Sequence, residues 1–451
     1  MCVRKALVVR EKLYQVKKFL DPFKFLANAH MTSFITHNYW ETLPEDIRTE
    51  ASTLTADEMY EIFWLWGRDP VNFQLQTAIG KFLKDCWDLT LASELFNDLL
   101  VSEKICQEQP RSKCMSLKKN HEVNNLKEKV ANICNTSKSN CVVDVGGGKG
   151  YLGTSLVLEK KIQVLSIDSK SGNTKGAAKV FERVEKRTNA STLPSPSYQH
   201  ATAFVTPETN LLEIVNEKLG SSVRHQLCLT GLHVCGDLAS TCIKLFVKSH
   251  AVVSLCTIGC CYNLITEKFG IDATPEKKDG FGFPLSNFLI EETYVLGRNA
   301  RMIACQSIER ICHERKVMNP SLFWRAALQV HLLRCLGSEC EISVGRRCSK
   351  AGSLSDYFHR VQQCLEQNLQ LSEKTIKELE FETCDSHDRM IKFYCLRLAL
   401  APVIETLIIL DRLLYLHEKG IENAFIMKVF DGVKSPRCHA IIAMKMEGTI
   451  A

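Results

Sequence analysis

Apolar and polar positions divide the chain into a helical start, an alternating middle and a helical end. Residues 1–113 contain apolar clusters at helical spacing, such as residues 59–66 and 92–101, and predict a helical N-terminal domain. After residue 140, short apolar runs alternate with helix-like segments. Strands are predicted at residues 141–145, 162–167, 199–205, 226–234 and 251–258, with helices at residues 151–161, 175–187, 211–219 and 238–248. This alternation predicts a parallel sheet with helices on both faces.

The last part of the chain contains the remaining strands of this sheet. A long helix is predicted at residues 391–419, and two strands follow at residues 424–430 and 438–446. The mainly helical stretch before them is therefore interpreted as an insertion. The predicted fold is an α/β, Rossmann-like sheet with a helical N-terminal domain and a helical insertion before the last two strands. Its segments are residues 1–113, 114–270, 271–390 and 391–451.

A glycine loop follows the first strand of the alternating region. Asp144 lies on the strand, and Gly146, Gly148 and Gly150 follow at alternate positions. Such a loop approaches a ligand closely, and the next helix offers free N–H groups. The order D-x-G-x-G-x-G favours S-adenosylmethionine. The pattern from Gly148 to Gly153 also fits the dinucleotide motif, so an NAD-dependent oxidoreductase stays open, whereas a P-loop is excluded by its spacing.

A second acid, Asp168, ends the second strand. A carboxylate there accepts the hydroxyls of a ribose, which both S-adenosylmethionine and NAD present. The structural alternative is that Asp168 only caps the next turn. The spacing of strand, loop, helix, strand and acid matches one βαβ unit and favours the cofactor interpretation.

The ends of the fourth and fifth strands are expected to face the substrate. His233 is a candidate general base, although a structural histidine remains an alternative. Cys261 is a candidate nucleophile without an identified base. His233, Cys235, Cys260 and Cys261 offer mixed nitrogen and sulfur ligands, but Cys-x-x-Cys spacing is missing and neighbouring strand residues point to opposite faces. No metal is therefore predicted.

The composition of the chain indicates where in the cell the protein is located. The chain has 451 residues, a formal net charge of +6 and 21 scattered cysteines, and no charged-then-apolar leader precedes them. A cytosolic or nuclear location is expected. Residues 398–416 reach the length of a membrane span but contain Glu405, Asp411 and Arg412, so a buried helix is predicted instead, and no membrane.

Basic residues are concentrated between Arg298 and Lys350. Arg298 and Arg301 are three apart and would share a helix face, and Arg346 with Arg347 would form a second cluster. Such an excess fits an RNA backbone. A solvated helix face is the alternative, because no aromatic residues are interleaved for base stacking.

Several segments together resemble the methyltransferase-like protein 25 family. The resemblance rests on residues 115–122, 143–152, 229–238, 258–262, 282–285, 297–301, 405–416 and 435–437. It implies a class I S-adenosylmethionine fold and a probable methyltransferase, with Asp144, Gly146, Gly148 and Asp168 around the cofactor. Besides His233, we take Tyr262 as a catalytic candidate. Candidate substrate contacts are Lys118, Lys119, Cys261, Arg298, Arg301 and Arg437.

The acceptor is expected to be RNA rather than protein, although both stay open. Some relatives carry the label of ribosomal RNA adenine dimethylase, but the Asn/Asp-x-Pro-Tyr signature of those enzymes is replaced here by residues 233–236. The His-x-Cys-Gly sequence resembles that of tRNA ribose methyltransferases. A non-catalytic binding module that retains the cofactor fold is the alternative from another functional class.

Overall fold

The chain forms two compact units. The computed structural model describes residues 2–102, 105, 115–188, 197–221, 224–270, 280–337, 348, 350–364 and 371–445. The first unit comprises residues 1–19, 89–307 and 403–451, and the second comprises residues 20–88 and 308–402. These boundaries differ from those of the four predicted segments, because residues from both helical parts of the chain join in the second unit.

The first unit contains an eight-stranded sheet with the order β1-β7-β8-β6-β5-β2-β3-β4. All neighbouring strands are parallel except β8, which is antiparallel to both β6 and β7. This is the order of a class I methyltransferase sheet with one added edge strand, so the predicted fold class is confirmed. The strands are β1 (Leu100–Ser102), β2 (Cys141–Val145), β3 (Gln163–Asp168), β4 (Tyr198–Thr202), β5 (Leu227–Cys235), β6 (Val252–Cys260), β7 (Asn423–Lys428) and β8 (His439–Met444).

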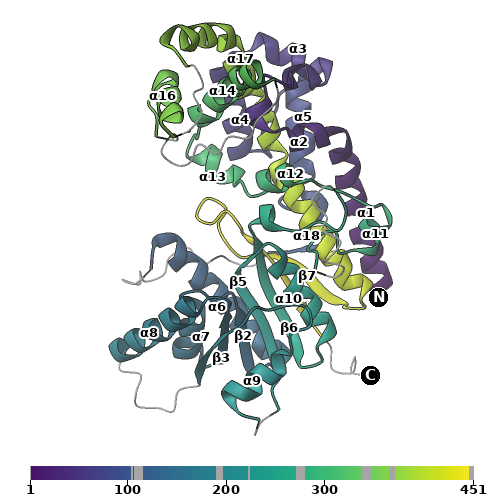
Figure 1. Ribbon diagram of the computed structural model, residues 1–451. Helices are drawn as coiled ribbons and strands as arrows, with labels where there is room; N and C mark the ends of the chain where they lie inside the picture. The colour runs from purple at the N-terminus through teal and green to yellow at the C-terminus, as the bar shows by residue number, and fades with distance from the viewer. Residues whose placement is uncertain are drawn as a thin grey trace. The chain divides into compact units, whose positions relative to one another are not determined.

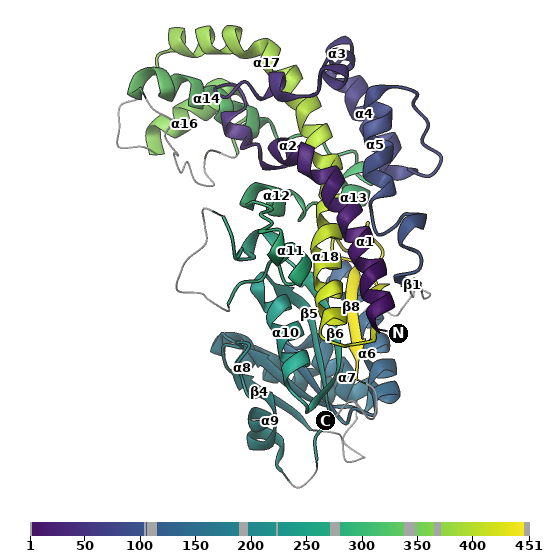
Figure 2. The ribbon, with the colours of Figure 1, turned by 90° about the vertical axis from the view of Figure 1, so that its right-hand side faces the viewer.

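Helices cover both faces of this sheet. In Figure 2, β5, β6 and β8 lie between α10 on one side and α6 and α7 on the other. All five residues of β2 are buried, as expected for a central parallel strand covered on both faces. The helices of this unit are α1 (Cys2–Leu20), α6 (Leu117–Ser137), α7 (Tyr151–Lys160), α8 (Ser171–Thr188), α9 (Leu211–Leu219), α10 (Asp237–Lys248), α11 (Asn287–Glu291), α12 (Arg298–Ile303) and α18 (Ala401–Glu418).

The strand order reverses at β2. Strand β3 follows β2 in the chain and pairs with it on one side, whereas β5 pairs with it on the other. Figure 1 shows these central strands together in the lower part of the ribbon. Ligands of open α/β sheets bind at the carboxyl ends of the strands, where the order reverses. A ligand is therefore expected beside the residues that follow β2 and β5.

Two predicted elements differ from the structure. Residues 92–101, expected to be helical, contain a short 3-10 helix at Glu94–Phe96 and strand β1, which pairs with β7. The helix predicted at residues 391–419 is divided into α17 (Glu373–Ala399) and α18 around Leu400. Pro402 explains the division, because a proline inside a helix lacks an N–H donor and clashes with the preceding turn.

Among the described residues, the helical stretch Glu373–Glu418 is long and apolar enough to cross a membrane. Its most apolar part is 83% buried inside the protein, and the core helices of soluble proteins have the same length and composition. Asp411 on α18 shows that this helix makes hydrogen bonds inside the protein. Its buried carboxylate accepts hydrogen bonds from the backbone N–H groups of Leu285 and Ser286 at 2.8 and 2.9 Å, close to the start of α11.

The second unit is helical in its described residues. Its helices are α2 (Lys24–Asn28), α3 (Glu45–Thr53), α4 (Ala56–Arg68), α5 (Ala78–Asp88), α13 (Ile308–His313), α14 (Pro320–Leu336), α16 (Leu354–Cys364) and α17. Helix α4 begins with a capping box, in which Thr55 and Glu58 satisfy each other's backbone N–H groups. Within this unit, α4 packs against α13 and α17.

Candidate functional site

The glycine loop between β2 and α7 is shaped by three left-handed residues. Gly146 has φ +71°, Gly148 has φ +56° and Gly150 has φ +68°, a backbone region that favours glycine. The N–H of Gly146 donates to the Ile167 carbonyl at 2.8 Å and ties the loop to β3. Gly146, Gly147 and Gly148 line a cavity of about 190 Å³. The loop thus borders open space, as a ligand-binding loop must.

Packing is a further reason for a glycine at Gly150. It does not line this cavity, and a Cβ atom on it would lie 2.6 Å from the Tyr198 hydroxyl and 2.7 Å from the Ala177 Cβ atom. Tyr198 donates a hydrogen bond to the Gly150 carbonyl at 3.2 Å. At Gly148, by contrast, a Cβ atom would meet no atom closer than 3.9 Å. The structure therefore explains Gly150 by packing under the loop and leaves Gly148 beside the cavity.

Asp144 is a buried carboxylate that faces this cavity. Its side chain is 2% exposed, and its Oδ2 atom has no hydrogen-bond partner among the described residues. Burial raises the pKa of Asp144 to about 7, with nearby Lys119 opposing the rise and Asp168 adding to it. An uncompensated buried carboxyl group of this kind favours a cationic partner.

Asp168 organises the loop from the neighbouring strand. Its Oδ2 atom accepts the Gly148 N–H at 3.1 Å, and its Oδ1 atom accepts the Lys170 N–H at 2.9 Å and the Asn173 amide at 3.0 Å. Asp168 therefore does cap the following turn, which was the structural alternative. A carboxylate has about four acceptor sites, so these three bonds leave capacity for a ligand hydroxyl.

His233 and the buried Glu122 form a pair across the cavity wall. The His233 Nε2 atom on β5 lies 3.2 Å from Glu122 Oε2 on α6, and His233 lines the cavity. Ser435 donates a hydrogen bond to the other carboxylate oxygen at 2.9 Å. Burial alone would raise the pKa of Glu122, but the hydrogen bond and charge of His233, with Lys119 and Lys118, lower it to about 2. Glu122 is therefore a stable anion beneath the histidine.

Lys118 and Lys119 both approach Glu122. Their Nζ atoms lie 3.6 and 3.4 Å from the Glu122 carboxylate oxygens. Lys118 is exposed, and Lys119 lines the cavity together with the exposed Lys149. Of these two predicted substrate contacts, Lys119 therefore borders the cavity, whereas Lys118 does not line it.

Tyr262 and Arg437 do not line the cavity. Tyr262 is 1% exposed and donates a hydrogen bond to Glu405 Oε1 at 2.9 Å. Arg437 is buried, lies over the Tyr262 ring and approaches the same carboxylate oxygen at 2.9 Å. Burial, with the Glu405 charge, raises the pKa of Tyr262 well above its usual value. These contacts hold the loop after β6, so the geometry does not support direct catalysis by Tyr262 or substrate contact by Arg437.

Arg301 is likewise engaged inside the protein. It is 4% exposed, and its Nε atom donates to Glu267 Oε1 at 2.6 Å. Its Nη1 atom donates to the carbonyls of Tyr262, Asn263 and Ile265. The predicted basic helix face is therefore not formed, because Arg298 is exposed while Arg301 is buried.

The second predicted basic cluster, Arg346 and Arg347, lies outside the described residues. Of the four arginines named for an RNA surface, Arg298 is exposed and Arg301 is buried in the part of the chain that the structure places.

Cysteines gather at the adjacent ends of β5 and β6. The Sγ atoms of Cys235, Cys260 and Cys261 all lie within 4.8 Å of one another, and those of Cys235 and Cys260 are 3.2 Å apart. The Cys260 hydrogen bond lowers the pKa of Cys235 to about 6, and the same pairing raises the pKa of Cys260. Burial raises the pKa of Cys261, which argues against an activated nucleophile there.

Sequence reasoning did not single out Glu122, Tyr198 or Leu232. Glu122 belongs to a segment that carried the family resemblance, and its spacing of four and three residues from Lys118 and Lys119 was an available signal. Tyr198 had no comparable signal, because its contact with Gly150 joins β4 to the loop through tertiary packing. Leu232 adds apolar surface to the cavity.

Comparisons with known proteins find a matching domain family and similar chains. The family model described as a methyltransferase domain, Methyltransf_32, matches residues 118–268. "Probable methyltransferase-like protein 25" of Homo sapiens is 26% identical over 97% of each chain. The chain is therefore similar to methyltransferase-like protein 25 along nearly its whole length. This finding confirms the resemblance inferred from the sequence.

Two further likenesses complete the comparison. The Mus musculus protein with the same name is 34% identical over 66% of this chain, which corresponds to 50% of the mouse protein. The solved structure of coclaurine N-methyltransferase bound to N-methylheliamine and SAH is 11% identical, covers 96% of this chain and all of its own, and has a TM-score of 0.23. That likeness is too weak to carry an argument. The matched methyltransferase domain includes Glu122, Asp144, Asp168 and His233.

Proposed function

We propose that this protein is an S-adenosylmethionine-dependent methyltransferase that acts on RNA. The observation that carries the cofactor assignment is the unpartnered Oδ2 atom of Asp144, which is buried at the wall of the cavity. A cationic ligand with an ammonium and a sulfonium group would satisfy this carboxylate. A dinucleotide carries a pyrophosphate instead, and a second anion beside Asp144 would be unfavourable.

The residues of the site fit this cofactor. Asp144 and the backbone of Gly146 and Gly148 would hold its amino-acid end, and Asp168 has acceptor capacity for its ribose hydroxyls. The open space at Gly148 would admit the ligand. When bound, the cofactor supplies an electrophilic methyl group. The remaining task of the chain is to bind and orient the acceptor atom and to accept its proton.

His233 is suited to that proton transfer. A carboxylate only accepts hydrogen bonds, so the Nε2 atom that faces Glu122 carries the proton. In the neutral imidazole, Nδ1 then has the free lone pair and can accept a proton from a nucleophile. The Glu122 anion stabilises the imidazolium that results. We assign His233 as the proton acceptor and Glu122 as its positioning residue.

RNA is favoured over protein because the cavity has cationic borders. Lys119 and Lys149 line it, and Lys118 is exposed one residue before Lys119. Phosphate groups pair readily with such lysines, and their contribution depends on salt. The proposed location in the cytosol or nucleus rests on the cysteine usage of the sequence.

Methyl transfer from labelled cofactor to separate RNA and protein fractions tests the whole proposal. We expect label in RNA with the wild type and with the surface variant Lys138→Ala, and loss of label with Asp144→Ala. Label in the protein fraction alone would replace RNA by a protein acceptor. Cofactor binding without turnover would favour a non-catalytic module, and calorimetric binding of NAD in place of S-adenosylmethionine would overturn the cofactor assignment.

A further inference from the structure

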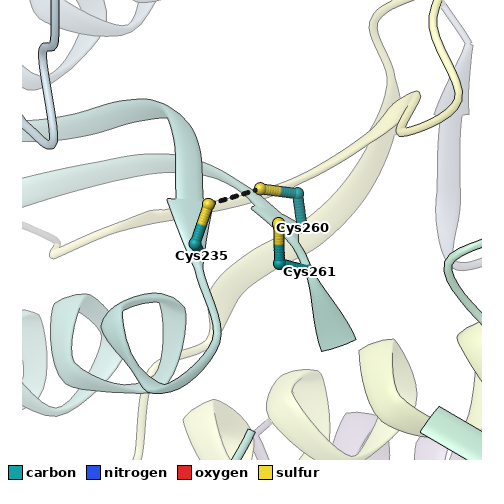
Figure 3. Close-up of side chains that lie close together, drawn as sticks. All are labelled: Cys235, Cys260 and Cys261. Atoms are coloured by element: carbon teal, nitrogen blue, oxygen red, sulfur yellow. Dashed lines mark hydrogen bonds between the residues drawn. The ribbon is translucent and has the colours of Figure 1, made fainter. Parts of the chain in front are cut away.

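The cysteine cluster at the ends of β5 and β6 lies outside the cavity and has no role in the proposed methyl transfer. Figure 3 shows the three sulfur atoms of Cys235, Cys260 and Cys261 turned toward one another. Cys235 ends β5, Cys260 ends β6, and the two residues are partners in the parallel ladder. The N–H of Gly236 donates to the Cys260 carbonyl at 3.1 Å and holds this pairing. The two strand ends thus present their thiols in register.

The Cys261 thiol reaches the other two thiols because the backbone turns at this residue. Neighbouring residues in a strand point to opposite faces, which argued against a shared site for Cys260 and Cys261. Cys261, however, follows the last residue of β6 and has φ +51° and ψ +52°. This left-handed conformation is unfavourable for a residue with a side chain, typically by about 1 kcal/mol or more, and such positions cluster at functional sites. It brings the Cys261 sulfur to the same side as Cys260.

We propose that Cys235, Cys260 and Cys261 form a three-thiolate site for a d¹⁰ metal ion of the Zn²⁺ type. Thiolates are the ligands that Zn²⁺ and similar soft or borderline cations prefer. Zinc–sulfur bonds of about 2.3 Å in tetrahedral geometry place ligand sulfurs about 3.8 Å apart. The Cys235–Cys260 separation of 3.2 Å lies somewhat below this, and all three pairs lie within 4.8 Å. Small side-chain rotations would adjust both values.

The cluster has three members among the described residues, so the fourth position would be taken by water or by a substrate atom. Cys260 is buried, Cys261 is half-buried and Cys235 is exposed, so solvent reaches one side of the site. Binding the ion would release the protons of the thiols that are not already ionised.

The proposed metal site lies directly after an irregularity in the ladder between β5 and β6. The ladder between β5 and β6 shifts register between Gly231 and Val234, and the shifted segment contains Leu232 and His233, which line the cavity. An irregularity of this kind redirects side chains. A metal ion bound directly after it would fix the two strand ends and thereby the orientation of His233.

Metal content of the full-length protein tests this inference. Protein purified with a reductant would be incubated with Zn²⁺, desalted and analysed by mass spectrometry of the elements. We expect about one Zn²⁺ per chain in the wild type and in Cys384→Ser, whose thiol is exposed elsewhere. We expect its loss in the triple variant Cys235→Ser, Cys260→Ser, Cys261→Ser. With Co²⁺ as the probe, thiolate-to-metal charge-transfer absorption is expected in the first two proteins only.

A second measurement needs no variant. Zn²⁺ should protect Cys235 from alkylation in the folded wild type and leave the exposed Cys384 reactive, as mapped by peptide mass spectrometry. Absence of bound Zn²⁺ in the folded, reduced wild type would overturn the inference, as would equal metal content in the triple variant. Metal content and alkylation do not depend on methyl transfer, so this inference and the proposed function fail separately.

Discussion

The Nε2 atom of His233 on β5 lies 3.2 Å from the Oε2 atom of Glu122 on α6, and the Glu122 side chain is fully buried. The pair joins the strand after the sheet reversal to the helix that precedes the glycine loop. A histidine held in this way has a defined orientation and a defined proton on Nε2.

His233→Ala is expected to lower methyl transfer by roughly a hundredfold or more, because proton transfer contributes that much in comparable sites. Affinity for S-adenosylmethionine should stay close to that of the wild type, since the cofactor residues are on β2 and β3. Turnover rates and calorimetric binding measure the two effects. His250→Ala, at an exposed position, is the matched control. A folded His233→Ala protein that turns over at the wild-type rate would make His233 structural.

Glu122→Gln is expected to change the acid stability of the protein. The pKa of Glu122 is held at about 2 in the folded state, below its ordinary value of about 4.3. The carboxylate therefore stabilises the fold above about pH 4.3, and this contribution, on the order of 3 kcal/mol, is lost as pH falls toward 2. Urea unfolding as a function of pH should show a smaller acid loss in Glu122→Gln. An identical pH profile would contradict the assignment.

Asp144→Asn is expected to act in opposite directions on stability and on binding. Burial raises the folded-state pKa of Asp144 to about 7, so the protein loses stability as pH rises from about 4 to about 7. The variant should therefore be more stable than the wild type at about pH 8, by on the order of 1–3 kcal/mol, and similar at about pH 5. It should bind S-adenosylmethionine poorly at both. Equal destabilisation at both pH values would show that Asp144 is already compensated.

Gly148→Ala is expected mainly to weaken cofactor binding, whereas Gly150→Ala is expected mainly to lower stability. At Gly150 the φ is also positive and the added carbon would lie 2.6 Å from the Tyr198 hydroxyl, and the expected loss of stability is about 1–3 kcal/mol or more. At Gly148 there is space, so only the positive φ costs stability, about 1 kcal/mol, while the carbon enters the ligand space. Thermal unfolding and cofactor affinity separate the two. Gly172→Ala, on α8 with no atom within 4 Å, is the control.

Arg301→Ala and Arg298→Ala are expected to separate internal structure from RNA binding. Removing the buried Arg301 leaves the Glu267 carboxylate without its cationic partner, with only the backbone N–H groups of Leu296 and Gly297 bound to it, at a cost of about 3–5 kcal/mol. Removing the exposed Arg298 should change stability by less than about 0.5 kcal/mol. If Arg298 contacts a phosphate, the slope of log affinity against log salt should fall by about one unit. An unchanged slope would exclude Arg298 from the RNA surface.

The elements that were predicted correctly depend on neighbouring residues, whereas the strand that was missed depends on a distant partner. The predicted helix at residues 211–219 has the bounds of α9, and strands β2 and β3 lie where the apolar runs end in Asp144 and Asp168. Strand β1 was not predicted, because it has three residues and its partner β7 lies more than three hundred residues later in the chain. Local periodicity does not report such pairings.

Some of the candidate site residues line the cavity, whereas others are paired inside the protein. Asp144, Gly146, Gly148, His233 and Lys119 line one cavity. Arg301 and Arg437 looked equally available in the sequence, yet each is buried against an acid that is distant in the chain, Glu267 and Glu405. A basic residue alone does not reveal whether its partner is a phosphate or an internal carboxylate.

By itself, the sequence determined the βαβ arrangement, the glycine loop with its two acids and the resemblance to a known family. These features depend on neighbouring residues, whose spacing fixes strand ends, turns and helix starts. Only the tertiary structure decided that Glu122 lies beneath His233, that Tyr198 requires Gly150 to be a glycine and that the Cys261 thiol turns toward Cys235 and Cys260. Each of these depends on the packing of separate elements or on one backbone torsion, and residue spacing specifies neither.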